Sequence, residues 1–369
     1  MPKKILIISN TAWYIYNFRI SLMRSLRDRG HAIIAVAPVD EYVARIQGEG
    51  FGFIPVAINR KGTNPFEDLL LAYRFYQMFK QEKPDVILTY TPKPNIYASL
   101  AARFLKIRLI NNVEGLGYVF INPGFLTSIV QQLYKIAFKR SYRVFFLNDD
   151  DRKLFLEKRL TRKSTAEKIP GCGIDTRRFI PQSRDAERKE FVFYLVARLL
   201  WDKGVGEYVE AARLLKSKYP HAECRLVGFV DPENPQGISR QQIKSWVDEK
   251  IISYDGASDD IINVMKKADC IVLPSYREGL SKVLLEAASM AIPIIATDVT
   301  GCKEVIQDGI TGYLCKLKNI DDLVKKMEQM LLLPEDERAL MGKRGREKMI
   351  CEFDERFVIQ RYIDAIDSL

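Results

Sequence analysis

Two glutamates stand eight residues apart in the stretch EGLSKVLLEA, residues 278–287. Glu278 comes just before an apolar run that is typical of a helix, and Glu286 lies two turns inside that run. A carboxylate accepts hydrogen bonds from two vicinal hydroxyls, so Glu286 suits a ribose and Glu278 suits the hydroxyls of a hexose. The alternative is structural, with Glu278 as a first-turn helix charge and Glu286 facing solvent.

The residues between these glutamates predict an anion site. Gly279 lets a ligand approach the backbone closely, and Ser281 suits the N-cap or first turn of the helix. Free backbone N–H groups at Leu280, Ser281 and Lys282, together with the helix dipole, are suited to bind a diphosphate.

Two cations follow an earlier strand, in LVARLLWDKG (195–204). Arg198 comes just after the strand, and Lys203 lies five residues further on. Such a pair can neutralise charge that develops on a departing diphosphate, and arginine can do so with two hydrogen bonds. Taken singly, each is better explained as a solvated surface cation. Opposite a helix N-terminus in the same cleft, they become groups that stabilise a leaving group.

Strand-like runs alternate with helical patterns along both halves of the chain, which predicts two parallel, doubly wound α/β sheets. The expected strands are 4–9, 31–37, 51–58, 85–90, 108–113 and 143–148, then 191–197, 223–228, 251–256, 270–275, 293–297 and 311–315. The 369 residues fit two Rossmann-like domains, 1–175 and 176–355, with a C-terminal helix, 356–369, packing back on the first.

The motifs are expected where the strands end, because ligands bind outside the carboxyl ends of the strands in open α/β sheets. We expect both sheets to present these ends to one cleft. Neither half has GxGxxG after its first strand, which argues against a nicotinamide dinucleotide enzyme.

The positive charge of the chain is concentrated in its first half. Residues 1–175 contain 27 Lys+Arg and 15 Asp+Glu, or +12, and the remainder contains 57−27=30 and 47−15=32, or −2. A one-sided basic surface can hold nucleic acid, anionic lipid or a phosphorylated substrate, or serve only solubility.

The chain shows no signal for export or for a membrane span. MPKKILIISN lacks the apolar region and cleavage site of a signal peptide, and no apolar stretch is long enough to span a bilayer. The six cysteines have no CxxC pair or metal-like spacing, so we expect reduced thiols in the cytoplasm without structural zinc.

The second half resembles a known family. ARxxxxKG with Arg198 and Lys203, LPSYREGLSKVLLEA with Glu278 and Glu286, and TDVTGCKEVIQDGITGYL (297–314) are similar to the motifs of retaining nucleoside-diphosphosugar glycosyltransferases. These are the large fourth family with the GT-B fold and the E-x7-E motif. The resemblance covers essentially the whole chain.

The first half narrows this resemblance. YIYNFRISLMRSL (14–26), NPF (64–66), VEGLG (113–117) and LYKIAFK (133–139) are similar to bacterial transferases that add N-acetylgalactosamine to undecaprenyl-diphospho-diacetylbacillosamine. Related polyprenyl-acceptor transferases share parts of this pattern. The implied donor is UDP-N-acetylgalactosamine or a related UDP-sugar, which is a substrate, so no cofactor is expected.

The resemblance assigns the donor site residue by residue. Arg198 and Lys203 match the pair that contacts the diphosphate, Glu286 matches the ribose-binding glutamate, and Glu278 matches the glutamate near the donor sugar.

A second group of residues is also placed near the donor by this resemblance. TGCKEV puts Gly301, Cys302 and Glu304 there, although many relatives have a second glycine in place of Cys302, which leaves the closeness of backbone approach open. The uracil is expected beside Gly256 to Asp260.

A polyprenyl diphosphate-linked acceptor presents an anionic group at the membrane surface, which fits a basic first domain. Arg19, Arg60 and Lys93 lie in or beside loops after strands and are the expected contacts of the acceptor diphosphate. Residues 117–143 fit an interfacial helix or, equally, a buried helix with basic flanks. We expect a cytoplasmic protein peripherally bound to the inner face of the plasma membrane.

The two histidines, His31 and His221, both favour structural roles, so retention by front-face displacement fits better than a histidine base. Glu114, at the end of the fifth strand, is expected to orient the acceptor hydroxyl or stabilise the developing cation; pairing with a nearby cation is an equal alternative. No metal is expected, since the acids at 149–151 and 259–260 suit helix starts.

Other functions are kept as alternatives. Another UDP-sugar transferase of capsule, O-antigen or exopolysaccharide synthesis fits the same motifs. A UDP-N-acetylglucosamine 2-epimerase needs acid–base groups around C2 that are not evident. The basic residues are dispersed and form no nucleic-acid motif, so no nucleic-acid partner is expected.

Overall fold

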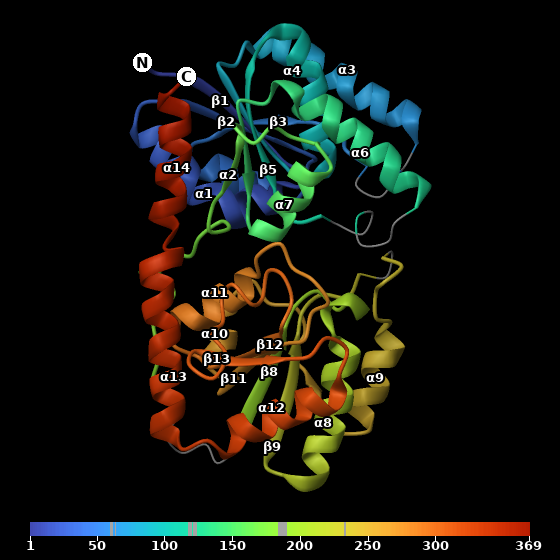
Figure 1. Ribbon diagram of the computed structural model, residues 1–369, viewed down its shortest axis with the longest axis vertical. Coiled ribbons are helices and arrows are strands. Elements are labelled where there is room, and N and C mark those ends of the chain that lie inside the picture. The colour runs from blue at the N-terminus through green and yellow to red at the C-terminus, as the bar shows by residue number, and fades with distance from the viewer. Residues whose placement is uncertain (60–61, 63, 117–119, 121–123, 184–189, 232–233) are drawn as a thin grey trace. The chain divides into compact units, whose positions relative to one another are not determined.

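The chain folds into two units, Met1–Cys172 together with Arg356–Leu369, and Gly173–Glu355 (Figure 1). The computed structural model describes residues 1–59, 62, 64–116, 120, 124–183, 190–231 and 234–369. Each unit has its own parallel sheet, as the alternation of strand and helix patterns predicts. The predicted fold class, two doubly wound α/β domains, is confirmed.

A seven-stranded parallel sheet forms the centre of the described part of the first unit, in the order β3-β2-β1-β4-β5-β6-β7. The order changes direction between β1 and β4, which is the point where open α/β sheets bind ligands. The strands are β1 Lys4–Ile8, β2 Ala32–Ala37, β3 Gly52–Pro55, β4 Val86–Tyr90, β5 Arg108–Val113, β6 Arg143–Phe146 and β7 Ala166–Lys168.

Helices cover both faces of this sheet. Leu71, Phe75 and Phe79 of α3 recur every four residues and pack against one face with α4. α1 and α14 bring Arg19 and Tyr362 beside Tyr90 of β4. The helical segments are α1 Ala12–Asp28, α2 Val43–Gly48, α3 Pro65–Glu82, η1 Pro94–Ala98, α4 Ser99–Leu105, α6 Phe125–Ala137, η2 Phe138–Arg140, α7 Asp149–Glu157 and α14 Glu355–Asp367.

The described part of the second unit holds a six-stranded parallel sheet in the order β10-β9-β8-β11-β12-β13. This order changes direction between β8 and β11. The strands are β8 Phe191–Val196, β9 Ala222–Val227, β10 Ser253–Tyr254, β11 Cys270–Leu273, β12 Ile294–Thr297 and β13 Gly312–Cys315.

Alternate residues of β8 belong to two separate cores in this unit. Phe193 and Leu195 share one core with α8, α9 and α12, whereas Val192 and Tyr194 share the other with α10 and α11. The helical segments are η3 Trp201–Lys203, α8 Val205–Lys218, α9 Arg240–Asp248, α10 Ile261–Met265, α11 Lys282–Ser289, α12 Ile320–Leu332, α13 Glu335–Lys348 and η4 Met349–Phe353.

One strand was not predicted from the sequence. β7 has three residues, Ala-Glu-Lys, and pairs with β6 at the edge of the first sheet. A segment this short and charged shows neither an apolar run nor an alternation, so its pairing depends on β6 rather than on its own pattern.

The acidic clusters lie at helix starts, as predicted. Asp260 is the N-cap of α10 and accepts a hydrogen bond from Asn263 N at 3.1 Å. In the other cluster Asn148 is the N-cap of α7, and the aspartates 149–151 occupy the first turn. The described residues contain no group of three or more His, Cys, Asp or Glu side chains that could hold a metal ion.

A comparison of two helical glycines tests the packing of α13. A Cβ at Gly342 would lie 2.0 Å from Ala291 O, whereas a Cβ at Gly48 of α2 meets no atom within 4 Å. We expect Gly342→Ala to lower the free energy of unfolding by about 1–3 kcal/mol because backbone must move. The control Gly48→Ala should raise it by roughly 0.4–1 kcal/mol, since alanine restricts the unfolded chain. Thermal and denaturant unfolding measure both; equal midpoints for the two variants would contradict this packing.

Candidate functional site

The donor-side residues lie at the switch point of the second sheet. β8 and β11 are neighbours there, and ligands bind outside the carboxyl ends of such strands. The loop after β8 carries Arg198 and Lys203, and the loop after β11 carries Glu278. The sequence prediction that these motifs follow strand ends is therefore consistent with the topology.

Backbone hydrogen bonds tie three loops together around Glu278. Tyr276 N donates to Asp202 O at 2.9 Å, which joins the loops after β11 and β8. Glu278 N donates to Thr300 O at 3.0 Å, and Ser281 N donates to Gly301 O at 2.9 Å, which joins the loops after β11 and β12. The segment before α11 is thus fixed from both sides, as a preformed binding site requires.

Lys203 and Glu278 form an ion pair, with Lys203 Nζ 2.6 Å from Glu278 Oε1. Their side chains are 16% and 15% exposed, so the pair is largely shielded from water. The two residues were predicted to contact different parts of one donor, and the structure brings them into direct contact.

Arg198 differs from Lys203 in its surroundings. Its side chain is exposed, and its guanidinium forms no ion pair with any described residue. A planar guanidinium without a protein acid beside it remains available for an external anion such as a diphosphate.

Glu286 is buried inside α11, with 6% of its surface exposed. This burial raises the pKa of its carboxyl, while the positive charges of Lys282 and Arg178 act in the opposite direction. Lys282 Nζ lies 3.8 Å from Glu286 Oε1, one helical turn away. The solvent-facing alternative for Glu286 is wrong.

The predicted anion site corresponds to the amino end of α11. Ser281 is its N-cap but makes no side-chain capping hydrogen bond, so it leaves part of the first turn uncapped. Gly279 lies in the loop before it, and Leu280 packs partly against the α11 core. Lys282, the first helical residue, is 25% exposed.

The loop after β12 requires a glycine at position 301. Its φ is +85°, and a Cβ would lie 2.4 Å from Glu278 O. Glu304 accepts a hydrogen bond from Gly301 N at 2.7 Å, so this acid holds the turn itself. The adjacent Cys302 is fully buried, and burial raises the pKa of its thiol. The close backbone approach in this turn is between Gly301 and Glu278.

Gly256 lies on a separate loop of the same sheet. It follows β10, and its carbonyl accepts a hydrogen bond from Gly228 N at 2.9 Å. A Cβ at Gly256 would meet no atom within 4 Å, so the space beside it is open.

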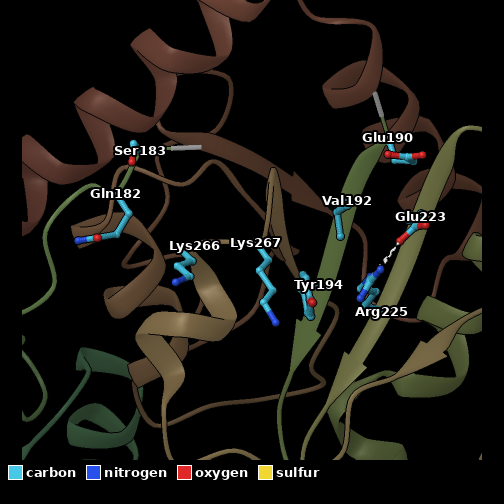
Figure 2. Close-up of a pocket in the computed structure, with 9 residues that line it drawn as sticks. All are labelled: Gln182, Ser183, Glu190, Val192, Tyr194, Glu223, Arg225, Lys266 and Lys267. Atoms are coloured by element: carbon cyan, nitrogen blue, oxygen red, sulfur yellow. Dashed lines mark hydrogen bonds and ion pairs between the residues drawn. The ribbon is translucent and has the colours of Figure 1, made fainter. Parts of the chain in front are cut away.

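A second polar region of this unit contains none of the predicted residues. It is a cavity of about 470 Å³. Its lining includes Val192, Tyr194, Glu223 and Arg225 (Figure 2). Val192 and Tyr194 lie in β8, and Glu223 and Arg225 lie in β9. All four therefore come before the carboxyl ends of their strands.

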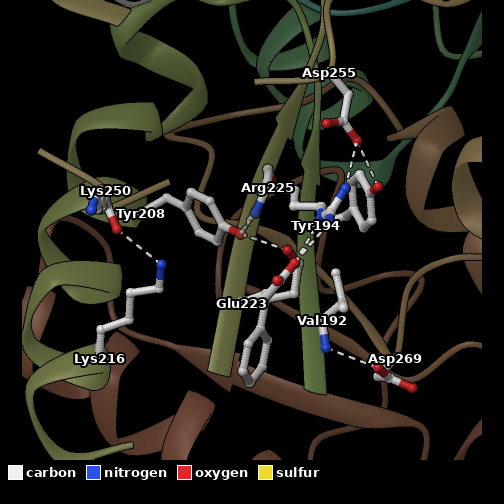
Figure 3. A network of polar contacts seen from close by, with 10 residues as sticks. Val192, Tyr194, Tyr208, Lys216, Glu223, Arg225, Lys250, Asp255 and Asp269 are labelled. Atoms are coloured by element: carbon white, nitrogen blue, oxygen red, sulfur yellow. Dashed lines mark hydrogen bonds and ion pairs between the residues drawn. The ribbon is translucent and has the colours of Figure 1, made fainter. Parts of the chain in front are cut away.

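Two of the charged residues that line this cavity, Glu223 and Arg225, pair with each other. Arg225 Nε donates to Glu223 at 2.9 Å, and Tyr194 OH donates to Asp255 at 2.7 Å (Figure 3). Arg225 also lies 3.5 Å from Asp255, so acids and a base are paired. We do not place the donor in this cavity, because its lining contains none of the residues that the motifs assign to the donor.

The candidates in the first unit are placed differently from the prediction. Arg19 is not beside a loop: it lies in the middle of α1, is 2% exposed and forms an ion pair with Glu114. Lys93 Nζ lies 2.6 Å from Asp68 Oδ1, beside a cavity of about 510 Å³. Arg60 lies outside the described residues.

Glu114 also contacts a residue that sequence reasoning missed. Tyr14 OH donates to Glu114, and it accepts a hydrogen bond from Arg19 Nη2 at 2.6 Å. Tyr14 begins the motif YIYNFR, but nothing in its spacing to Glu114, 100 residues away, indicates the contact. Pairing with a nearby cation was the alternative prediction for Glu114, and its ion pair with Arg19 confirms it.

The predicted interfacial segment is 117–143, and part of it forms α6. Residues 117–119 and 121–123 of this segment lie outside the described residues. One side of α6 and the following turn is buried, with Tyr134 and Phe138 in the core. On the other side Leu126, Ile129 and Ile136 are 42%, 41% and 46% exposed. Among the described helices none is both long and apolar enough to cross a membrane.

Comparisons with known proteins agree with this architecture. The family model Glycosyl transferases group 1 matches residues 176–348, and Glycosyl transferase 4-like matches residues 4–148. The chain is similar to the N,N'-diacetylbacillosaminyl-diphospho-undecaprenol alpha-1,3-N-acetylgalactosaminyltransferase of Campylobacter jejuni, with 31% identity over 98% of each chain. It is 25% identical to the UDP-Gal:alpha-D-GlcNAc-diphosphoundecaprenol alpha-1,3-galactosyltransferase of Escherichia coli, over 86% of this chain and 82% of that one.

Solved structures share the fold at low sequence identity. A glycosyltransferase from Rickettsia africae matches with a TM-score of 0.80 and 21% identity, over 98% of this chain and 97% of that one. HepE from Anabaena, in complex with UDP and glucose, matches with a TM-score of 0.82 and 18% identity over 100% of both chains. The chain therefore belongs to the group 1 glycosyltransferases and has the GT-B fold.

Proposed function

We propose that this chain transfers N-acetylgalactosamine, or a related hexosamine, from a UDP-sugar to a sugar linked to undecaprenyl diphosphate, with retention of the anomeric configuration. The observation that carries this proposal is the full-length similarity to the Campylobacter transferase, whose name states that sugar and a diphospho-undecaprenol acceptor. The cations and carboxylates at the switch point of the second sheet support it, because they match the charges and hydroxyls of a nucleotide sugar.

Donor binding in this proposal exchanges one ion pair for another. Arg198 binds the diphosphate directly, since it has no acid to release. Lys203 is held by Glu278 until phosphate oxygens replace that carboxylate. The exchange frees Glu278 to accept hydrogen bonds from the donor sugar. Binding of the diphosphate to Lys203 therefore also makes the carboxylate available to the sugar.

Glu286 binds the ribose in this scheme. Burial disfavours its charged form, and Lys282 at 3.8 Å compensates only in part. Two ribose hydroxyls that donate to the carboxylate stabilise the buried charge. Ribose recognition thus uses a group that is poorly satisfied before the donor arrives.

The transfer step needs no metal in this proposal, because Arg198, Lys203 and the amino end of α11 supply positive charge to the departing UDP. The bond between the anomeric carbon and the diphosphate oxygen breaks, and the acceptor oxygen forms its bond on the same face. The acceptor proton passes to the departing diphosphate. Glu114 lies on the other unit and orients the acceptor hydroxyl.

We also place the first unit on the inner face of the plasma membrane. Between 86 and 148 the chain has eight Lys or Arg and one acid, the buried Glu114. α6 adds exposed leucine and isoleucine side chains, followed by Lys135, Lys139 and Arg140. Apolar side chains beside a basic group are suited to an anionic lipid surface.

A second donor is supported by one comparison. The Escherichia coli relative is named for transfer of galactose to a diphosphoundecaprenol-linked sugar, so UDP-galactose is the alternative donor. Both alternatives belong to the same reaction class and differ in the substituent at C2.

The function is tested with a panel of UDP-sugars and undecaprenyl diphosphate-linked diacetylbacillosamine or N-acetylglucosamine, with and without EDTA. We expect transfer of N-acetylgalactosamine in both conditions and an α-linkage by NMR. Absence of transfer from every donor would refute the proposal, and interconversion of free UDP-sugars would indicate an epimerase.

Arg198→Ala should lower kcat by about 10²–10³, because the departing diphosphate loses a charged hydrogen-bond donor. The control is Arg213→Ala on α8, which removes an exposed arginine from the same unit and should leave kcat unchanged. Steady-state kinetics with saturating acceptor measure both. Equal kcat values for the two variants would exclude Arg198 from the transition state.

Glu286→Ala should weaken UDP binding, whereas Glu278→Ala should mainly lower kcat, since the first loses ribose contacts and the second loses contacts to the sugar. Calorimetric titration with UDP and steady-state kinetics separate the two effects. Glu249→Ala, at an exposed position of the same unit, is the control. If both site variants kept wild-type kinetics, the assignment of the two glutamates would be wrong.

Replacing Leu126, Ile129 and Ile136 together by serine should weaken binding to vesicles of phosphatidylcholine and phosphatidylglycerol by about tenfold or more, because apolar area no longer enters the bilayer. Leu332→Ser on α12, where leucine is 64% exposed, is the control and should bind as wild type does. Vesicle sedimentation gives the measurement. Unchanged binding of the triple variant would show that α6 does not contact lipid.

A further inference from the structure

A charged pair is buried in the first unit, in the middle of a sheet–helix interface. Arg19 of α1 is 2% exposed and forms an ion pair with Glu114, which directly follows β5. Taking such charges out of water costs several kcal/mol per ion, and apolar residues of similar volume often give equal or greater stability. Packing alone therefore does not account for the pair.

Both contacts to the carboxylate arrive at one oxygen. Tyr14 OH and Arg19 Nη2 each donate to Glu114 Oε1, and Arg19 Nη2 lies 2.6 Å from Tyr14 OH. No described residue donates to Oε2, and the Glu114 side chain is 15% exposed. One oxygen is thus held from the interior, and the other is left for a partner from outside.

Aromatic rings enclose the arginine behind this carboxylate. The Tyr90 ring lies 4.2 Å from the guanidinium carbon of Arg19, and Tyr362 of α14 is fully buried nearby. Tyr362 OH donates to Asn112, which fixes α14 to β5. Arg19 Nε has no hydrogen-bond partner among the described residues, so the polar contacts of this guanidinium all go to Tyr14 and Glu114.

Glu114 therefore titrates in a defined environment. The titratable or charged groups around it in the described residues are Arg19 and Tyr14 of α1, Tyr90 of β4 and Tyr362 of α14, with Cys172 near Tyr14. Burial raises the pKa of Glu114, while the charge of Arg19 and the hydrogen bonds from Tyr14 and Arg19 lower it.

We propose that Arg19 and Tyr14 are positioning residues that hold Glu114 as a fixed carboxylate and leave Oε2 to accept a hydrogen bond from the attacking acceptor hydroxyl. This inference rests on the proposed transferase function. The hydrogen bond orients the acceptor hydroxyl, and the hydroxyl proton still leaves with the departing diphosphate. Arg19 then serves Glu114 rather than the acceptor diphosphate, the role expected from the sequence.

Tyr14→Phe is the mildest test, because it keeps the ring stacked 4.9 Å from Phe18 and removes only the hydroxyl. We expect kcat/KM for the acceptor to fall about tenfold or more, with unchanged UDP affinity. The acid limb of the pH profile should move to higher pH, because the charged form of Glu114 loses a hydrogen bond. A purely structural tyrosine would lower stability without moving this limb.

Arg19→Met has a matched control on the same helix. Arg24 Nη2 pairs with Glu49 Oε1 at 2.5 Å, with Arg24 45% exposed, so Arg24→Met removes an exposed arginine–glutamate pair. We expect the acid limb to rise by about one to three pH units in Arg19→Met, since a nearby cation lowers a carboxyl pKa by that amount. Arg24→Met should keep the wild-type profile.

The outcomes separate the two proposals. If wild type transfers sugar and Tyr14→Phe has the wild-type pH profile and kcat/KM, the positioning role is overturned and the transferase function stands. If wild type transfers no sugar from any UDP-sugar to any diphosphate-linked acceptor, the proposed function falls and the positioning role with it. Shifted limbs in Tyr14→Phe, with Arg24→Met unchanged, support the inference.

Discussion

Charge compensation at the ion pair between Lys203 and Glu278 is the constraint on which the donor side depends. A lysine and a glutamate, 16% and 15% exposed, are in direct contact in a region that excludes most water. Lys203 Nζ lies 2.6 Å from Glu278 Oε1. Backbone hydrogen bonds tie the loop that carries Glu278 to the loops after β8 and β12. In the proposed donor binding, a diphosphate displaces the carboxylate while these backbone hydrogen bonds keep the loops in place.

The first unit also contains an ion pair between a basic residue and a glutamate, but its basic residue is more deeply buried. Arg19 is 2% exposed, against 16% for Lys203, and aromatic rings close off its far side. An arginine in this position stays protonated, and its planar group fixes one carboxylate oxygen. In the proposed mechanism the pair of Lys203 and Glu278 exchanges partners, whereas the more enclosed pair of Arg19 and Glu114 holds one geometry. This difference follows from the deeper burial of Arg19 and from its planar guanidinium.

The sequence predicted the fold class and most strands because strand and helix periods alternate strongly in both halves. It failed where the answer depended on tertiary contacts. Arg19 was expected in or beside a loop after a strand, but it lies within α1 and its side chain contacts an acid 95 residues away. The motif spacing placed Glu278 and Glu286 on one segment, yet it could not show that Lys203 pairs with the first or that the second is buried. Local patterns specify elements, whereas these pairings arise only when the sheets assemble.

The C-terminal helix links folding of the chain to the chemistry of the first unit. α14 belongs to the unit built from Met1–Cys172, and its Tyr362 lies against Phe145 and donates to Asn112. The environment of Arg19 is therefore completed by residues that are synthesised after the second unit. Since domains generally fold as units during synthesis, the first unit can reach its final packing only after the second has been made. The surroundings of the pair of Arg19 and Glu114 are thus complete only once α14 has packed against the first sheet.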